Sequence, residues 1–196
     1  MPQLLTYPEI NTTAWQELMD RSPYATWFQT PEAYAFYASN PDEMMPFAFG
    51  VLELEAKGER LKVKGEENSA AETVASTPYT LHPTPTLKGV IVGYITRERN
   101  ALKQFFTRRA IIIGGPLLAE DATAEEIAAL LNAVKKLQRS DLQSAGRSTA
   151  KRSTGHSPIY IETRNFHDYS KWKTIFEQCG FLYQPHYDIH VHCNAT

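Results

Sequence analysis

The sequence predicts a single α/β (α+β) domain, residues 1–196, in which a mixed, mostly antiparallel sheet is flanked by helices. Three observations point to this fold class. The chain has 196 residues, of which 42% are hydrophobic, enough for one core and short for two. Helical and extended segments follow one another in the order helix, helix, three strands, helix, strand, helix, strand. Hairpins come first and crossovers later, which favours a mixed sheet covered by helices.

Two short helices are expected near the N-terminus. Thr13 and Gln16 have the spacing of a capping box, and the first helix should end at Ser22. Thr30 is the expected cap of the second helix, because Pro31 then occupies the first helical position, where its missing N–H costs nothing.

A hairpin with a long insertion should follow. Residues 44–56 and 89–96 are rich in apolar and β-branched side chains and predict two paired strands. The stretch 57–88 is rich in Lys, Glu, Ser, Thr and Pro and has no periodicity. Such a composition predicts a disordered insertion at the tip of the hairpin.

The second half of the chain begins with a strand, residues 108–114, that runs into a tight turn at Gly114-Gly115-Pro116. Thr123 and Glu126 form a capping box for the clearest helix. The core face of this helix is expected to consist of Ile127, Leu130, Leu131, Val134 and Leu137.

A basic stretch, residues 144–157, contains no acidic side chain and predicts a mobile, solvated loop. Contact between this loop and an RNA is the less favoured alternative, because the charges are not clustered and no aromatic residue is close. A strand at 159–163 and a short helix capped by Asp168 or Ser170 are expected next. Gly180 should end that helix, and residues 181–193 predict the last strand.

The bulk properties exclude several classes of protein. The formal charge of −2 demands no nucleic acid or acidic partner, and residues 1–10 do not form a secretory signal. Residues 110–119, the longest apolar run, are broken by glycines and proline and are too short to insert in a membrane. Cys179 and Cys193 are expected to be reduced. The sequence therefore predicts a cytoplasmic protein.

The order of elements is similar to the GNAT acetyltransferase fold, and four stretches resemble the first half of Fem-type (FemA, FemB, FemX) peptidoglycan aminoacyltransferases. The stretches span nearly the whole chain: Ser22-Pro23 with residues 27–30, residues 109–116, residues 161–165 and residues 180–183. The resemblance implies a protein of two GNAT-like domains that transfers an amino acid from aminoacyl-tRNA to a cell-wall precursor peptide.

The resemblance also implies that this chain is the N-terminal, substrate-side domain, inactive until a second GNAT-like domain joins it. Its partners would be a peptidoglycan precursor and an aminoacyl-tRNA. The substrate-binding residues expected from these stretches are Arg109, Arg164, Asn165 and Tyr183. The family uses basic side chains near the second helix, yet residues 22–56 contain no Lys or Arg. This departure keeps open an alternative, a stand-alone binding or adaptor domain without catalytic activity.

No cofactor is expected. An acetyltransferase of the GNAT type binds coenzyme pyrophosphate with backbone amides at a helix N-terminus. Gly114-Gly115 is the nearest candidate here, but Pro116 lacks an amide donor, and the stretch 116–119 lies between the turn and the helix cap at Thr123. The turn is therefore expected to be structural. No Ser, Cys or His lies in a nucleophile motif, so no catalytic residue is assigned.

Arg164-Asn165 lies at the carboxyl end of a predicted strand, where open α/β sheets commonly bind ligands. Arg164 can hold a phosphate or carboxylate with two parallel hydrogen bonds. The favoured alternative is that Arg164 pairs with Glu162 or with a helix end, while Asn165 forms a turn.

Alternating side chains in the last predicted strand leave two interpretations open. Same-face neighbours on a strand are about 7 Å apart, which allows two imidazoles to bind one zinc ion. A polar face that borders solvent or a second domain is the favoured interpretation, because the apolar opposite face explains the strand by itself, and no metal is expected. The candidate ligands are His186, Asp188, His190 and His192.

Overall fold

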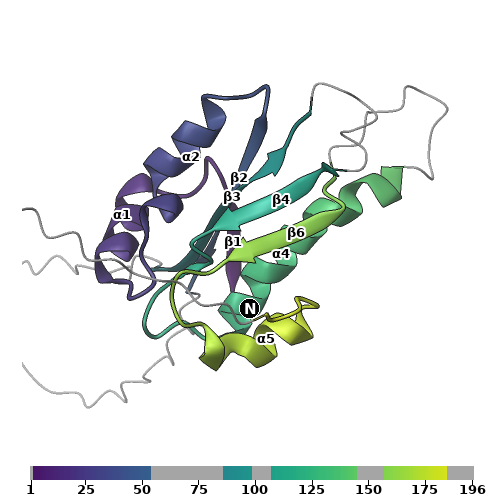
Figure 1. The fold of residues 1–196 in the computed structure, drawn as a ribbon. Helices are drawn as coiled ribbons and strands as arrows, with labels where there is room; N and C mark the ends of the chain where they lie inside the picture. The colour runs from purple at the N-terminus through teal and green to yellow at the C-terminus, as the bar shows by residue number, and fades with distance from the viewer. Residues whose placement is uncertain (1, 54–85, 99–106, 145–156, 185–196) are drawn as a thin grey trace, which may run out of the picture.

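The computed structural model describes residues 2–53, 86–98, 107–144 and 157–184 of the chain. Its strands form one sheet in the order β1-β2-β3-β4-β6, with β5 paired to β3 off this path. All pairs are antiparallel except β4 with β6, which is parallel. The predicted fold class is confirmed (Figure 1). The strands are β1 (Gln3–Thr6), β2 (Met44–Leu52), β3 (Leu87–Thr96), β4 (Arg109–Ile113), β5 (Leu117–Leu118) and β6 (Tyr160–Arg164).

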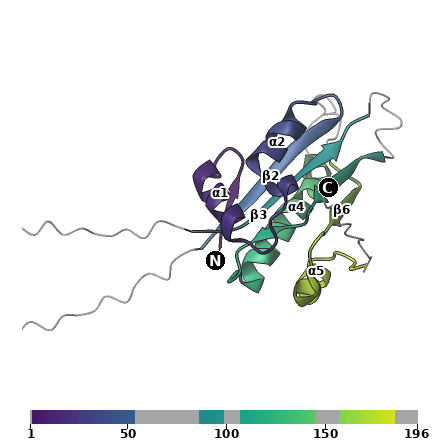
Figure 2. The same ribbon diagram turned by 60° about the vertical axis from the view of Figure 1, so that its left-hand side comes forward.

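Helices cover both faces of this sheet (Figure 2). On one face, α1 and α2 pack against β2 and β3, and on the other face α4 crosses the same strands with α5 beside it. Short 3-10 turns precede α2 and α5. The bounds are α1 (Thr12–Arg21), η1 (Trp27–Gln29), α2 (Pro31–Ala38), α4 (Ala124–Ser144), η2 (Ser170–Trp172) and α5 (Lys173–Gln178).

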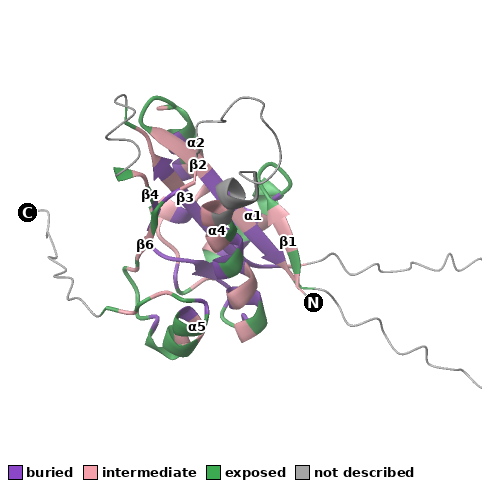
Figure 3. Ribbon diagram, turned by 90° about the vertical axis from the view of Figure 1, so that its right-hand side faces the viewer, coloured by how far each residue is buried: buried purple, intermediate pink, exposed green. Residues whose placement is uncertain are grey.

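The strand β3 lies between two hydrophobic cores and contributes alternate residues to each. Ile91 and Ile95 belong to the core under α4, whereas Val90 and Val92 belong to the core under α1 and α2. Because both faces of the strand are buried, its sequence is almost continuously apolar. Figure 3 shows this buried centre surrounded by helices with exposed outer faces.

Two of the four predicted helix caps are confirmed. Thr30 Oγ1 accepts a hydrogen bond from Ala33 N at 3.1 Å, and Thr123 and Glu126 form the predicted box, with Thr123 N donating to Glu126 Oε2 at 2.8 Å. The prediction for α1 is wrong, because Asn11 Oδ1, rather than Thr13, accepts from Ala14 N at 3.0 Å. Asn is an equally strong cap, so the helix begins one residue before Thr13.

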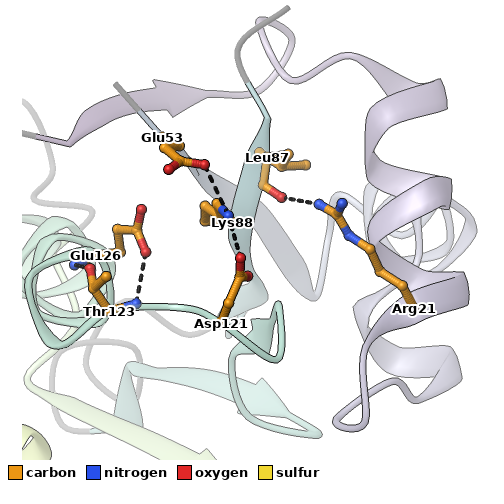
Figure 4. Close-up of polar contacts among 7 residues, drawn as sticks. All are labelled: Arg21, Glu53, Leu87, Lys88, Asp121, Thr123 and Glu126. Atoms are coloured by element: carbon orange, nitrogen blue, oxygen red, sulfur yellow. Dashed lines mark hydrogen bonds and ion pairs between the residues drawn. The ribbon is translucent and has the colours of Figure 1, made fainter. Parts of the chain in front are cut away.

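The base of the β2–β3 hairpin is fixed by a buried lysine (Figure 4). Lys88 Nζ lies 2.7 Å from Asp121 Oδ2 and 2.9 Å from Glu53 Oε2, and its side chain is 11% exposed. The hydrogen bond between Lys88 and Asp121 raises the pKa of the lysine and lowers that of the aspartate. Arg21 donates a hydrogen bond of 2.7 Å to Leu87 O.

The predicted insertion, residues 57–88, is too long, because Leu87 and Lys88 belong to β3. Residues 57–85 lie outside the described residues.

The C-terminal region departs from the sequence-based prediction. Residues 181–184 form no strand, and 185–196 lie outside the described residues, as do residues 145–156 of the predicted loop. The short helix is confirmed, and Gly180 follows it with φ +82°. Its predicted cap is wrong, because α5 begins after Trp172 without a side-chain cap, while Asp168 Oδ1 accepts from Ser170 N at 2.7 Å in the turn before it. Cys179 is a free thiol whose pKa is raised by burial.

Within the described ranges, every helix is too short or too polar to cross a membrane.

Candidate functional site

A glycine turn, Gly114-Gly115, follows β4 and lies beside the end of the parallel strand β6. Gly114 and Gly115 have φ values of +87° and +79°, a conformation that side chains strongly disfavour. A Cβ at Gly114 would collide with Thr26 Oγ1 and one at Gly115 with Asn165 Oδ1. The predicted tight turn is confirmed, and only glycine fits at both positions.

Two buried side chains, neither of them singled out from the sequence, bind the carbonyl groups of this turn. Gln29 Nε2 donates to Gly114 O at 3.2 Å and to Gly115 O at 2.9 Å. Tyr169 Oη donates to Pro116 O at 2.6 Å and to Gly114 O at 3.2 Å. Burial raises the pKa of Tyr169, so the phenol stays protonated and remains a donor.

The carbonyl groups of the turn and the amide of Gly114 thus form internal hydrogen bonds. Gly114 N donates to Arg164 O at 2.8 Å, which joins the ends of β4 and β6. An amide that already donates to a carbonyl is not directed at a phosphate group. This geometry agrees with the structural interpretation of the turn, and the expectation that the chain binds no coenzyme stays a prediction.

A second feature is a sheet surface beside α2 over which none of the described helices packs. Ile161 faces the core under α4, so the alternate residues of β6 face the other side, in register with alternate residues of β4. The helix α2 packs against β2 and β3 and not over this surface (Figure 1). The open sheet face, as we name it, consists of Arg109, Tyr160, Glu162 and Arg164, and Ile111 lies buried between Glu162 and Tyr94 on the same side.

Two arginines share one carboxylate on the open sheet face. Arg164 Nε lies 2.6 Å from Glu162 Oε1, and Arg109 Nη1 lies 3.9 Å from Glu162 Oε2. The hydrogen bond from Glu162 raises the pKa of Arg164 further. The predicted pairing of Arg164 with Glu162 is therefore confirmed. Since one carboxylate faces two guanidinium groups, the cluster carries an excess positive charge.

In the core under α1 and α2, the hydroxyl group of Tyr37 is buried without a hydrogen-bond partner among the described residues. Tyr37 is 3% exposed, and its ring lies 4.8 Å from that of Tyr94. Burial, with a smaller contribution from Tyr94, raises the pKa of Tyr37 to about 12. Tyr94 pairs with Ile111 of β4, which in turn pairs with Glu162 of β6, so Tyr94 and Glu162 lie on the same face of the sheet.

A cavity of about 800 Å³ runs along the outer edge of β6, towards α4 and the segment after α5. Arg164, Asn165 and Tyr183, three of the four predicted substrate-binding residues, line it together with Glu162. Arg109, the fourth, does not line the cavity but lies beside Glu162. The structure thus brings all four to one region around β6.

Asn165 has a structural role within this region. Its Oδ1 accepts a hydrogen bond from Thr163 Oγ1 at 2.6 Å and packs against Gly115. The four candidate metal ligands, His186, Asp188, His190 and His192, lie outside the described residues. Among the residues that are described, no three His, Cys, Asp or Glu side chains gather as a metal site would require.

Comparison with known proteins gives little guidance. No family model matches the chain, and no curated protein matches it significantly. A solved structure described as the crystal structure of a probable acetyltransferase is similar over 100% of this chain and 99% of that one, with a TM-score of 0.46 and 14% sequence identity. A likeness at this level carries no argument about function, and the fold class rests on the sheet topology itself.

Proposed function

We propose that this chain is the acceptor-binding domain of a Fem-like acyl or aminoacyl transferase. Its ligand would be an anionic cell-wall precursor peptide, bound around β6, and a second GNAT-like domain would bring the aminoacyl-tRNA. The single observation that carries this proposal is the excess positive charge of Arg109 and Arg164 around Glu162, beside the cavity along β6.

The chemistry of the region suits a peptide that carries carboxylates. Arg164 forms bidentate bonds to carboxylates readily, and Lys135 adds a second cation to the cavity wall. Tyr183 lies on the same wall, with Lys173 Nζ 5.8 Å from the centre of its ring. The proposed contribution to catalysis is positioning of the acceptor amine, because no nucleophile is assigned to the chain.

Calorimetric titration of the full chain with a soluble, carboxylate-bearing precursor peptide tests the proposal. Saturable binding is expected, and Lys135→Gln should weaken it several-fold, because a cation of the cavity wall is lost. Lys136→Gln is the matched control: this neighbouring lysine is exposed and does not line the cavity. No saturable binding, or equal effects of the two variants, would contradict the proposal.

The alternative function, a non-catalytic adaptor domain, is favoured by a different observation. Trp27, Phe36 and Phe166 are 52%, 54% and 38% exposed, and edge-to-face contacts link Trp27 to Phe36 and Phe28 to Phe166. Exposed aromatic groups of this kind are enriched where proteins bind one another. The peptide titration separates the two functions, because an adaptor that recognises another protein through this surface should give no heat with the peptide.

A further inference from the structure

We infer that the outer edge of β6 binds an extended peptide as an added strand, through hydrogen bonds between the two main chains. The outer edge, as we name it, is the side of Tyr160–Arg164 that faces away from β4. This binding mode rests on the proposed function, because it assumes that the ligand is a peptide, and it specifies how the peptide is held.

The cavity along β6 meets the strand edge-on. Side chains of a strand alternate between its two faces: Ile161 belongs to the core under α4, whereas Glu162 belongs to the open sheet face. All five residues of Tyr160–Arg164 nevertheless line the same cavity, and no residue of β4, which is described in full, lines it. Side chains of both faces border one space when that space lies beside the backbone. The cavity therefore runs past main-chain groups of β6.

The backbone of β6 is suited to a second strand partner. Among the described strands it pairs with β4 alone, in five consecutive parallel pairs without a shift of register. A strand that is paired on one side directs every second N–H and C=O group away from its partner. Prolines and bulges commonly block the edges of natural sheets, and Tyr160–Arg164 contains neither.

The opposite edge of the described sheet, β1, differs in this respect. Thr6 N donates to Glu9 Oε2 at 2.9 Å, so this amide is already satisfied within the turn that follows the strand. Pro8, two residues after β1, has no N–H to offer. An added strand is therefore expected at β6 and not at β1.

Apolar side chains on the cavity walls suit the side chains of such a peptide. Tyr160, Phe166 and Leu182 line the cavity and are 55%, 38% and 82% exposed. A peptide strand on β6 would cover part of this apolar surface with its alternate side chains, as in other proteins that bind a peptide by strand addition. The cavity volume of about 800 Å³ lies within the range of roughly 300 to 1,000 Å³ that is usual for ligand sites.

Two complementary patterns of N-methylation test this binding mode on the full chain. The parent peptide is neutral acetyl-Val-Thr-Val-Thr-Val-Thr-amide, and affinities are measured from NMR chemical shifts. One derivative is N-methylated on its valines and the other on its threonines, so each lacks the donors of one edge. The parent should bind saturably. The derivatives should differ at least tenfold in affinity, because the apolar cavity walls fix which edge of the peptide meets β6. Equal affinities of the two derivatives, or no binding of the parent, would overturn the inference.

Hydrogen exchange and one pair of variants place the peptide on β6. The parent peptide should slow the exchange of alternate amides in β6, while Thr6 of β1 should be unaffected. Leu182→Ser should weaken binding several-fold without lowering the melting temperature, because this side chain is 82% exposed. Tyr7→Ser is the matched control, an apolar side chain that is 49% exposed and follows β1 at the other edge. Protection outside β6, or equal effects of the two variants on affinity, would refute the assignment.

The two proposals fail separately. If the precursor peptide binds but the valine-threonine peptide does not, the acceptor is held without an added strand and the proposed function stands alone. If the valine-threonine peptide binds with the expected dependence on its edges but the precursor peptide does not, the strand site stands and the proposed acceptor is wrong. A second copy of the chain, or residues 185–196, in place of the peptide would leave the parent without a site, and this outcome also overturns the inference.

Discussion

Replacing Gln29 by leucine should destabilise the fold by about 2 to 4 kcal/mol. The glutamine is fully buried. Its Nε2 donates hydrogen bonds to Gly114 O at 3.2 Å and to Gly115 O at 2.9 Å. Its Oε1 accepts from Thr26 N at 2.7 Å. Each buried polar group left without its partner costs about 1 to 3 kcal/mol. Gly114 O keeps its hydrogen bond from Tyr169, so the groups left without a partner are Gly115 O and Thr26 N. The apolar side chain of leucine offsets part of the lost free energy of unfolding, because it is favourably buried.

Urea unfolding followed by tryptophan fluorescence measures this change, and Trp15 is a suitable reporter because its Nε1 donates to Gln29 O at 2.8 Å. Gln16→Leu is the matched control. Gln16 is exposed and its amide bonds Asp20 at the helix surface, so this variant should stay within about 0.5 kcal/mol of the wild type. The reasoning is refuted if Gln29→Leu also lies within about 0.5 kcal/mol of the wild type at an unchanged m value.

Three further predictions concern other parts of the fold. Because the pKa of Tyr37 is raised to about 12, the unfolded chain loses this proton first, and stability should fall between pH of about 10 and 12. Tyr37→Phe should remove this part of the fall in alkaline urea titrations, and an unchanged profile would contradict it. Pairing with Lys88 lowers the pKa of Asp121, so its contribution is present above a pH of about 4 and is lost as the pH falls through the lowered value. Asp121→Asn should therefore flatten the acid limb of the stability curve; a limb as steep as the wild type's would count against the pairing. Gly180→Ala should cost about 1 to 2 kcal/mol in urea unfolding, because φ there is +82°, and a neutral result would mean that the backbone relaxes.

Local sequence signals predicted the elements that depend on local interactions. Thr30 with Pro31 and the box of Thr123 with Glu126 begin helices as expected, because a cap acts within four residues. The strands β1 and β5 were not predicted, since four and two residues are too few to show a periodicity. Their pairing is decided by tertiary contacts.

The candidate site was predictable only in part. The bond between Glu162 and Arg164 follows from their spacing on one strand, since residues two apart share a face. The roles of Gln29 and Tyr169 could not be predicted, because their partners in the turn lie 85 and 55 positions away in the chain. The open sheet face depends on which strands α2 covers, and packing of a helix across a sheet leaves no local signal.

The closed base of the β2–β3 hairpin makes this position suitable for protein engineering. Glu53 N donates to Thr86 O at 2.9 Å, and Lys88 ties both strands to the start of α4. Glu53 and Thr86, the described residues on either side of 54–85, therefore lie next to each other. Since the entropy cost of closing a loop grows only slowly with its length, a reporter domain or a two-residue turn can take the place of this segment with the sheet register intact.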